Sequence, residues 1–574
     1  VTGEPGDYRL TGVVRDTEVP AAVEALLAAR IDRLPHDDRQ VLQSAAVIGT
    51  DVPLALLGAI ESGSADALGQ SVTRLQAAEF LYEKSVAAEP EYTFKHALTH
   101  EVAYGSLPAE RRRALHARIV TALESRGPHQ PGEPPERLAH HALRGELWEK
   151  AVTYLREAGE KATARSAYRE AATAFEQALV ALGHLPESRA TTEQAIDLRQ
   201  ELRVVLQPLH ELDRILAHLQ PAEDLAESLG DRARLGQVLS GLCNTWWVRG
   251  DHEHAVALGT RALELGNALG DITLRIPATI RLGAVHYNLG NYSTAVSILR
   301  HAIDLMRGRP ESERLGLAGL AAVMTNSWLS RSLSELGEFA EAQARAEEGL
   351  RIATAADQPF SLIAAHTDLG VLGLLQGRFA RAAVAFRSGV EIGHTWDVRV
   401  AWPWGDAGLA CALALQGERE DAIRVLEEAT TADGTSARYS LAQRVAWLGE
   451  AARSCGRWQE ARRLADEALR LARAHKERGH EAWALRLLGG LASDREPLEF
   501  SVAEGHYADA LALADALGMR PLVAHCHRGL GVLNRRIGAV DRARPELRMA
   551  LDLYHELGMV FWQEPTRAAL VDLR

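Results

Sequence analysis

The sequence predicts an all-α protein with a small β-wing, in which a compact helical domain precedes a long solenoid of helical hairpins. Three observations lead to this prediction. A pattern of leucine, glycine and alanine recurs about every 40 residues from residue 230 onward. Residues 35–125 instead contain three helical stretches followed by two short extended pieces. Between the two regions, residues 126–135 read RGPHQPGEPP, a composition typical of linkers.

The repeating pattern starts with a leucine followed by a small residue. The leucine–small pairs are Leu242-Cys243, Leu282-Gly283, Leu329-Ser330, Leu369-Gly370, Leu409-Ala410, Leu448-Gly449 and Leu530-Gly531. The matching glycines are Gly250, Gly290, Gly337, Gly377, Gly417, Gly456 and Gly538. The matching alanines are Ala255, Ala295, Ala342, Ala382, Ala422, Ala461 and Ala543. The leucines are spaced by 40, 47, 40, 40, 39 and 82 residues, and we place an off-register unit with Gly505 and Ala510 in the last gap.

This pattern is that of a helical hairpin. Two crossing helices need small residues at their contact, and the turn between them needs a glycine that adopts a left-handed conformation. Gly230-Asp231 and Gly270-Asp271 supply a helix stop followed by an N-cap. The pattern resembles the tetratricopeptide repeat, whose small, alanine and apolar positions match Gly283, Ala295, Leu299 and Ala302. We therefore predict a tetratricopeptide-like superhelix over residues 137–574.

The N-terminal region follows a different pattern. Three helical stretches occur in residues 35–80, and LYEKSVAAEPEYTFKHAL then offers two short extended pieces around a polar turn. Three helices and a wing predict a winged-helix-like domain over residues 35–125. Residues 126–136 form the predicted linker, and residues 1–34 precede the domain.

Composition narrows the function classes. The net charge of −13 argues against nucleic acid as a partner, and no apolar run is long enough to span a membrane. The four cysteines form no CxxC pair, so we expect buried thiols in a cytoplasmic protein. No lysine follows a glycine, so there is no P-loop, and HExxH, GxSxG and GxGxxG are absent. We expect no enzymatic activity and no cofactor in this chain.

Several stretches resemble multidomain signalling ATPases of the STAND type. The segment that follows their ATPase core is similar to VPAAVEALLAARIDRLP, VLQSAAVIG, LQAAEFLYE and YTFKHALTHEVAYGSL. The terminal repeats of bacterial class III adenylate or guanylate cyclase–ATPase–repeat fusions resemble GMRPLVAHCHRGLGVLNRRIG. The resemblance implies that this chain is the C-terminal half of such a protein, with residues 1–34 as the tail of an upstream ATPase module. It implies ATPase and cyclase domains in the same polypeptide, and ATP or ADP only with that core.

The stretch FKHALTH contains two histidines, four residues apart. His96 and His100 share one face if the stretch is helical, but a zinc site needs further ligands that the neighbouring sequence does not supply. The resemblance implies another role, because a winged-helix histidine in these ATPases contacts the β-phosphate of the nucleotide. His96 is the matching residue, although Ala97 stands where many relatives carry Asp. The alternative is that both histidines are packing residues.

The first helix of each hairpin in tetratricopeptide arrays lines a groove that holds partner peptides. The matching positions here are Asn244, Trp247, Tyr287, Arg331, Trp404, Glu450, Arg453, His525, Arg528 and Arg535. Aromatic and arginine side chains often dominate binding energy, although several could equally pack between hairpins. We therefore predict a non-catalytic sensor region that binds a protein, peptide or small-molecule signal and controls an upstream nucleotide-binding output. The alternatives are a transcriptional regulator of the maltose-activator type and a free-standing interaction scaffold.

Overall fold

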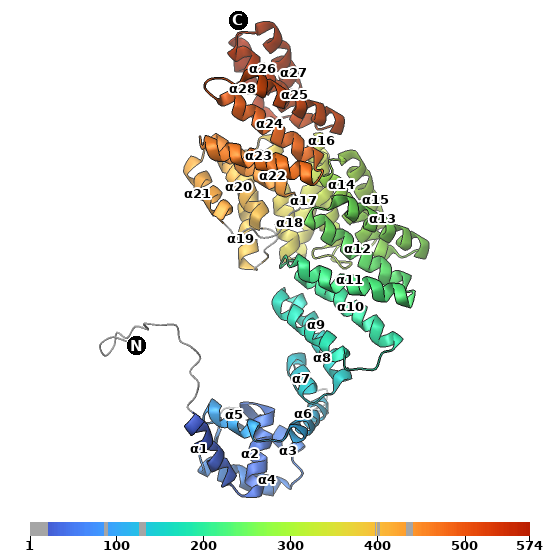
Figure 1. Cartoon of the computed structure of the whole chain (residues 1–574), viewed down its shortest axis with the longest axis vertical. Helices are drawn as coiled ribbons and strands as arrows, with labels where there is room; N and C mark the ends of the chain where they lie inside the picture. Colours follow the sequence, from blue (N-terminus) through green and yellow to red (C-terminus); the bar gives the residue numbers. More distant parts are fainter. Residues whose placement is uncertain are drawn as a thin grey trace, which may run out of the picture. The chain divides into compact units, whose positions relative to one another are not determined.

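The computed structural model describes residues 21–84, 90–125, 134–396, 398, 402–431 and 440–573, which contain 28 helices and three strands (Figure 1). The chain divides into two compact units. The first contains residues up to 161 together with 174–186, and the second contains 162–173 and 187–574. The predicted start of the repeats at residue 137 therefore does not coincide with the boundary of a unit. The polar turn of the predicted wing and most of the predicted linker lie outside the described residues.

The first unit contains short helices and a small sheet. Its elements are α1 (Ala21–Asp32), α2 (His36–Ile48), β1 (Asp51–Pro53), α3 (Leu54–Ile60), α4 (Ala65–Ala77), β2 (Leu81–Glu83), β3 (Glu91–Phe94), α5 (Ala97–Gly105), α6 (Ala109–Glu124) and α7 (Pro135–Arg144). The helices α8 (Trp148–Ala164) and α9 (Tyr168–Leu182) cross the boundary between the units.

The sheet is antiparallel, with the order β1-β3-β2. Val52 of β1 pairs with Tyr92 of β3, and Tyr82 of β2 pairs with Thr93. The two extended pieces predicted from the sequence are β2 and β3, whereas β1 was not predicted because its three residues are too few to show an alternating pattern.

The core of the first unit is apolar and is flanked by an ion pair between buried Asp38 and half-exposed Arg74. Leu42, Leu57 and Leu75 bring α2, α3 and α4 together and are fully buried. The guanidinium of Arg74 donates to both carboxylate oxygens of Asp38 at 2.7 and 2.8 Å. This bidentate contact joins α2 to α4, because its geometry is satisfied only when the two helices keep their register.

The second unit is an α-solenoid. Its helices are α10 (Arg189–Leu206), α11 (Leu212–Leu229), α12 (Arg232–Arg249), α13 (His252–Leu269), α14 (Ile272–Asn288), α15 (Tyr292–Leu305), α16 (Ala321–Leu336), α17 (Phe339–Ala356), α18 (Pro359–Gln376), α19 (Phe379–Thr395), α20 (Trp402–Gln416), α21 (Arg419–Thr431), α22 (Leu441–Ser454), α23 (Trp458–Ala474), α24 (Arg478–Asp494), α25 (Phe500–Leu517), α26 (Arg520–Arg536), α27 (Val540–Glu556) and α28 (Val560–Val571). From α12 onward, even-numbered helices are the first helices of the hairpins. Each packs against the next even-numbered helix as far as α26, so the first helices share one side of the solenoid.

The predicted hairpin residues have the expected geometry. All seven matching glycines have positive φ, and all seven matching alanines are fully buried. Gly230 and Gly270 end helices in the left-handed conformation, and the Asp residue after each caps the next helix. The four cysteines are buried and unpaired, as predicted. The α-solenoid prediction is therefore confirmed.

The placement of the off-register unit was wrong. Gly505 lies in the middle of α25 and not at a turn. The missing hairpin instead has Leu488-Gly489 as its leucine–small pair, 40 residues after Leu448, and its turn spans residues 495–499 without a glycine. The sequence search missed it because it required that turn glycine.

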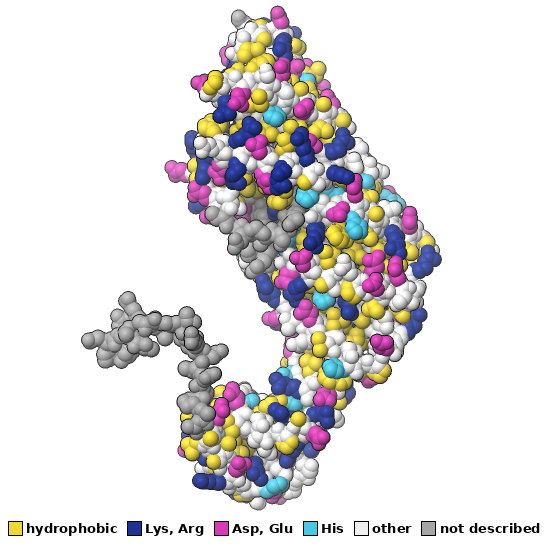
Figure 2. Space-filling model, in the orientation of Figure 1, with side chains coloured by type: hydrophobic (Ala, Val, Ile, Leu, Met, Phe, Trp, Pro, Cys, Tyr) yellow, Lys and Arg dark blue, Asp and Glu magenta, His cyan; other side chains and the backbone are white. Residues whose placement is uncertain are grey.

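The solenoid also contacts itself at long range. Helix α14 touches α24, and α16 touches α26. Trp483 Nε1 donates to Glu335 Oε2 at 3.0 Å across 148 residues of sequence. Acidic and basic side chains are interspersed on the face of the second unit seen in Figure 2. Among the described residues, no helix is both long and apolar enough to cross a bilayer.

Candidate functional site

All ten residues predicted to line the groove lie on first helices: Asn244 and Trp247 on α12, Tyr287 on α14, Arg331 on α16, Trp404 on α20, Glu450 and Arg453 on α22, and His525, Arg528 and Arg535 on α26. Four of the ten line two pockets. Glu450 and His525 line one pocket, and Asn244 and Trp247 line the other. The remaining six line neither pocket and take part in packing or ion pairs.

Three of the six are buried in the packing between first helices. Tyr287 is fully buried, and its ring lies 5.5 Å from that of Trp328. Arg331 donates to Asp368 at 2.5 Å, and its guanidinium lies 4.5 Å from the ring centre of Trp404. These side chains hold neighbouring hairpins together in the structure as described.

The other three are partly exposed arginines. Arg453 contacts Glu450 at 3.2 Å and Asp494 at 2.8 Å. Arg535 contacts Asp572 at 2.5 Å. Arg528 lies 5.6 Å from the ring centre of Trp562. Arg453 and Arg535 thus form ion pairs, and Arg528 lies beside an aromatic ring.

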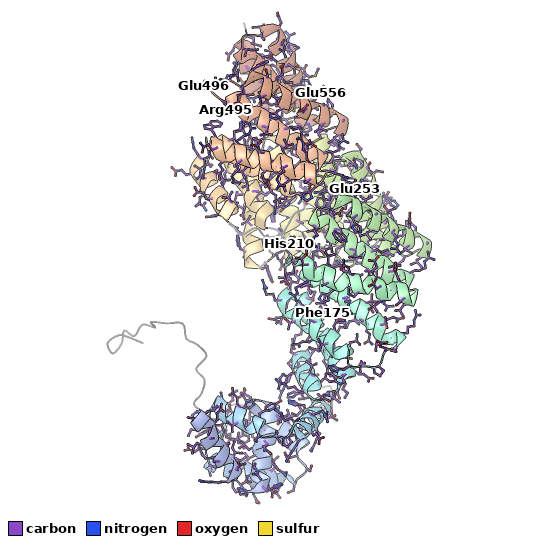
Figure 3. All side chains as sticks on the ribbon, viewed as in Figure 1. Phe175, His210, Glu253, Arg495, Glu496 and Glu556 are labelled. Atoms are coloured by element: carbon purple, nitrogen blue, oxygen red, sulfur yellow. The ribbon has the colours of Figure 1, made fainter. Side chains whose placement is uncertain are left out.

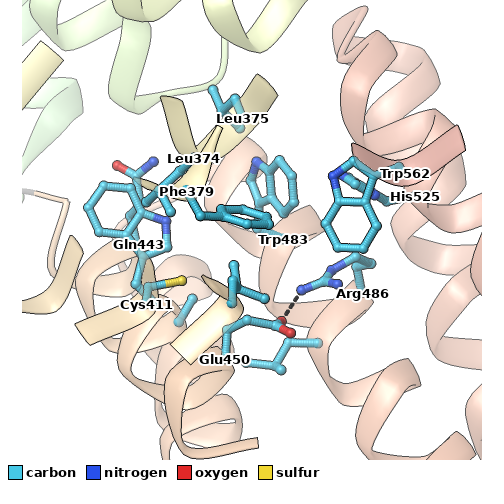
Figure 4. A pocket seen from close by; sticks show the side chains of 14 residues that line it. Leu374, Leu375, Phe379, Cys411, Gln443, Glu450, Trp483, Arg486, His525 and Trp562 are labelled. Carbon is cyan, nitrogen blue, oxygen red and sulfur yellow. Dashed lines mark hydrogen bonds and ion pairs between the residues drawn. The ribbon is translucent and has the colours of Figure 1, made fainter. Parts of the chain in front are cut away.

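The larger concentration of aromatic rings forms what we call the aromatic pocket, which has about 690 Å³ of space including the part open to solvent (Figure 4). Its rings are Phe379, Trp447, Trp483, His525 and Trp562. Its polar residues are Cys411, Gln443, Glu450 and Arg486, and leucines from α18, α20 and α24 complete the wall. Aromatic rings with few polar groups are typical of a site that holds an apolar side chain.

The repeat itself places these residues together. Gln443, Trp483 and His525 each lie five residues before the leucine of their own hairpin's leucine–small pair. Equivalent positions on adjacent first helices face the same side, because the hairpins stack with a constant small rotation. The pocket is therefore a property of three successive repeats.

The charges in the aromatic pocket are mutually compensated. Glu450 accepts hydrogen bonds from Arg486 and Arg453. Burial raises the pKa of the Glu450 carboxyl, but the two guanidiniums outweigh burial and hold that pKa below its ordinary value. Burial and the nearby Arg486 and Arg528 bring the pKa of His525 well below its ordinary value. His525 is therefore neutral at physiological pH, and its Nδ1 contacts the Tyr554 hydroxyl at 2.8 Å.

Three buried polar atoms in this pocket have no hydrogen-bond partner among the described residues. They are Gln443 Oε1, Arg486 Nε and Trp562 Nε1. A buried polar atom without a partner costs about 1–3 kcal/mol, so a ligand that satisfies these atoms gains affinity. The residues that line the pocket thus carry one buried acceptor and two buried donors that have no partner among the described residues.

The second hollow, which we call the arginine pocket, has about 640 Å³ of space including its open part. Trp247, Trp328 and Phe360 are its aromatic walls. Its polar residues are Gln207, His210 (labelled in Figure 3), Asn244 and Arg281. Residues 317–319 close one side, and they belong to the segment that lengthens one repeat spacing to 47 residues.

The two histidines of FKHALTH have different surroundings. His96 is the N-cap residue of α5 and is exposed. His100 Nε2 donates to the Ala46 carbonyl at 2.9 Å, and its ring contacts Phe94 and Tyr104. His100 is therefore a packing residue. Within the described residues, no three His, Cys, Asp or Glu side chains are placed to hold a metal ion.

The sequence reasoning missed several pocket residues for identifiable reasons. Trp483 and Arg486 belong to the hairpin that was misplaced, and Trp562 lies on α28, which carries no leucine–small pair. Arg281 and Trp447 directly precede the leucine of their pairs, a position that was not included among the groove candidates. Adding this position to the search would have found both.

Comparison with known proteins supports the reading of the repeats. Models of the tetratricopeptide repeat match residues 325–348, 403–428 and 448–480. The solenoid contains tetratricopeptide repeats. An uncharacterized protein of Rhizobium meliloti (strain 1021) is 27% identical over 344 residues, which are 57% of this chain and 33% of that protein. This chain thus spans about a third of that relative's length.

Two solved structures are similar to this chain at low identity. A Rap protein complexed with competence and sporulation factor is 13% identical, with a TM-score of 0.49 over 64% of this chain and 98% of that one. A STAND protein with a tetratricopeptide repeat sensor from Pyrococcus horikoshii is also 13% identical, with a TM-score of 0.31 over 71% of this chain and 64% of that one.

Proposed function

We propose that this chain is a non-catalytic sensor region whose repeats bind a segment of a protein or peptide on the inner side of the solenoid. The aromatic pocket is the observation that carries this proposal. Its five rings come from α19, α22, α24, α26 and α28, and its three partnerless polar atoms are of the kind that a peptide backbone satisfies. An apolar side chain of the ligand enters the pocket, and its flanking amides meet Gln443 and Trp562.

The first unit, in this proposal, is a winged-helix domain that transmits the signal. Its element order places α3 and α4 between β1 and β2, and β3 pairs with both outer strands, an arrangement that supports this proposal. His96 is exposed at the start of α5, where it could donate to a phosphate oxygen of a nucleotide held by an ATPase core. Ligand binding by the repeats then controls the output of such a core, including a cyclase, by shifting a two-state equilibrium.

A peptide-display experiment tests the binding role. A library of random 12-residue peptides is panned on the purified chain, and each enriched peptide is titrated against variants. Leu415→Glu places a carboxylate in the wall of the aromatic pocket. Leu269→Glu is the matched control, because Leu269 is exposed, lines neither pocket and also lies in the last turn of its helix.

We expect enriched peptides to share an apolar residue and to bind Leu415→Glu at least about 30-fold more weakly, since an unpaired carboxylate beside an apolar ligand group is strongly unfavourable. Leu269→Glu is expected to bind as the parent chain does. Failure to enrich any peptide, or equal affinity for Leu415→Glu, would overturn the proposal.

A further inference from the structure

Three arginines converge on the inserted segment between α15 and α16. Arg203 of α10 donates to the Gly316 carbonyl at 2.6 Å, and Arg281 of α14 reaches the same oxygen at 3.4 Å. Arg314 donates to the Ala318 carbonyl at 2.8 Å. The three guanidiniums thus hold a single stretch of backbone, and their positive charges lie close together.

This cluster has no carboxylate partner in the part of the chain that the structure describes. Arg203 and Arg281 are 4% and 5% exposed. Burial, together with the neighbouring Arg281 and Arg314, brings the pKa of Arg203 well below its ordinary value, and burial lowers that of Arg281 to about 10. Buried charges without a counter-ion are strongly unfavourable, so an anion that reached the cluster would be stabilised.

Arg281 connects the cluster to the arginine pocket. It lines the pocket, and its Nε has no hydrogen-bond partner among the described residues. It donates to Ser240 of α12, and Asn244 lies one helical turn beyond Ser240 on the same face. Asn244 also lines the pocket. One cation and one amide therefore face a space walled by Trp247 and Trp328.

We propose that the arginine pocket binds a carboxylate of the peptide ligand, next to an apolar group that packs on the indole rings. Only Arg281 of the three arginines lines the pocket, so the site offers one guanidinium, which matches the single charge and planar geometry of a carboxylate. The proposal rests on the proposed peptide-binding function and names a second contact point. The carboxylate comes from the chain end or from an acidic side chain.

Four short peptides distinguish these two sources. The probes are acetyl-Ala-Phe-Ala as the free acid and as the amide, and acetyl-Ala-Phe-Asp amide with its Asn counterpart. Each is titrated calorimetrically against the whole chain at low ionic strength. We expect at least one acid to bind about tenfold or more tightly than its neutral counterpart, the gain typical of a charge-assisted hydrogen bond. Equal affinity within both pairs would overturn the proposal, as would displacement of the acids by inorganic phosphate at lower concentration than by each other.

Asn244→Asp adds a stability measurement, which needs no probe, to the binding measurement. The new carboxylate lies near Arg281, so it supplies the missing counter-ion from within the protein. We expect a higher melting temperature than for the parent chain and loss of acid binding. A lower melting temperature, or acid binding that persists, would overturn the proposal. Arg281→Gln is expected to lose acid binding, and Arg307→Gln is the control because Arg307 is exposed and pairs with Asp304.

The two proposals fail separately. Leu415→Glu alters only the aromatic pocket, so the acid probes are expected to bind this variant unchanged. Acid binding that depends on Arg281 and Asn244 supports the carboxylate site even if peptide display fails. Enriched peptides without any dependence on Arg281, Asn244 or a carboxylate overturn the carboxylate site and leave the proposed function standing.

Discussion

Glu335 shows how the inner side of the solenoid constrains a single residue. Its carboxylate is 1% exposed, Oε2 accepts from Trp483, and Oε1 has no partner among the described residues. Burial raises the pKa of Glu335 to about 7 from 4.5, more than the indole N–H and His480 lower it. Between pH 4.5 and about 7, Glu335 therefore stays protonated in the folded protein but is ionised in the unfolded chain. The contribution of Glu335 to stability is therefore largest below pH 4.5 and declines as the pH rises from 4.5 to about 7.

Glu335→Gln is expected to remove this pH dependence. The amide keeps an acceptor for Trp483 and carries no charge, so the variant should be more stable than the parent by about 2 to 3 kcal/mol at pH 8 and by less than about 1 kcal/mol at pH 5. Urea unfolding at pH 5, 7 and 8 measures the difference. Glu564→Gln is the control, because Glu564 is 81% exposed. An equal effect of Glu335→Gln at all three pH values would show that Glu335 is ionised throughout.

The sequence predicts which side of each helix the groove candidates occupy, but not whether their side chains are accessible. Trp404 and Glu450 occupy first-helix positions that repeat geometry sends inward, yet Trp404 is buried against Trp447 while Glu450 lines a pocket. The difference arises from the sizes of neighbours on adjacent hairpins. The local sequence pattern carries no information about that packing. It therefore predicts which face of each helix lies in the groove, but not which residues line a pocket.

At the scale of the element, close helix crossings determine which glycines of a hairpin can be replaced by a larger residue. A Cβ atom built on Gly370 would lie 2.7 Å from the Phe386 ring, and one built on Gly283 would lie 2.6 Å from Leu299. A Cβ on Gly505 would have no atom within 4 Å. All three glycines are helical, so intrinsic helix propensity favours alanine at each of them.

The paired substitutions Gly370→Ala and Gly505→Ala are expected to have opposite effects. Gly370→Ala should destabilise the protein by about 1 to 3 kcal/mol, because overpacking outweighs the gain in helix propensity. Gly505→Ala should stabilise it by about 0.5 to 1 kcal/mol. Urea midpoints for the two variants measure both effects. Destabilisation by Gly505→Ala would indicate that this residue is a turn glycine after all.

Most hairpins could be predicted because crossing and turn impose residue types that the sequence shows directly. The hairpin of α24 and α25 is the exception. It keeps a small residue, Gly489, where its helices cross, and a Cβ atom there would lie 2.9 Å from Tyr507. Its longer turn contains no glycine. The crossing residue is therefore a more dependable marker of a hairpin than the turn glycine. The crossing has no alternative to a small side chain, whereas a turn can lengthen.

At the scale of the whole repeat unit, contacts between distant hairpins change how the solenoid holds together. Repeat arrays depend mainly on neighbouring units, so their ends can open independently. Here Glu477, which is fully buried, accepts hydrogen bonds from His252 at 3.0 Å and His480 at 2.9 Å. The first of these spans 225 residues. No sequence pattern predicts this contact, because it depends on curvature that accumulates over several repeats.

Loss of the Glu477 charge is expected to loosen two distant hairpins together. Burial raises the pKa of Glu477, but the hydrogen bonds from the two histidines outweigh it and lower that pKa to about 2. The contact therefore stabilises the fold above pH 4.5, and its contribution is lost as the pH falls toward about 2. Glu477→Gln at neutral pH should speed amide hydrogen exchange about tenfold or more at the start of both α13 and α24, because a buried charge network is broken.

Lys476→Ala is the matched control for this experiment. Lys476 also contacts a distant residue, Glu253 (labelled in Figure 3), 223 residues away, but the two side chains are 61% and 70% exposed. Exposed ion pairs contribute about 0 to 1 kcal/mol, so exchange in this variant should resemble that of the parent chain. Faster exchange at α24 alone in Glu477→Gln would mean that the two hairpins are independent. Faster exchange at both sites would mean that buried polar contacts join distant repeats into one cooperative unit. Ligand binding in one pocket could then change the stability of hairpins several repeats away.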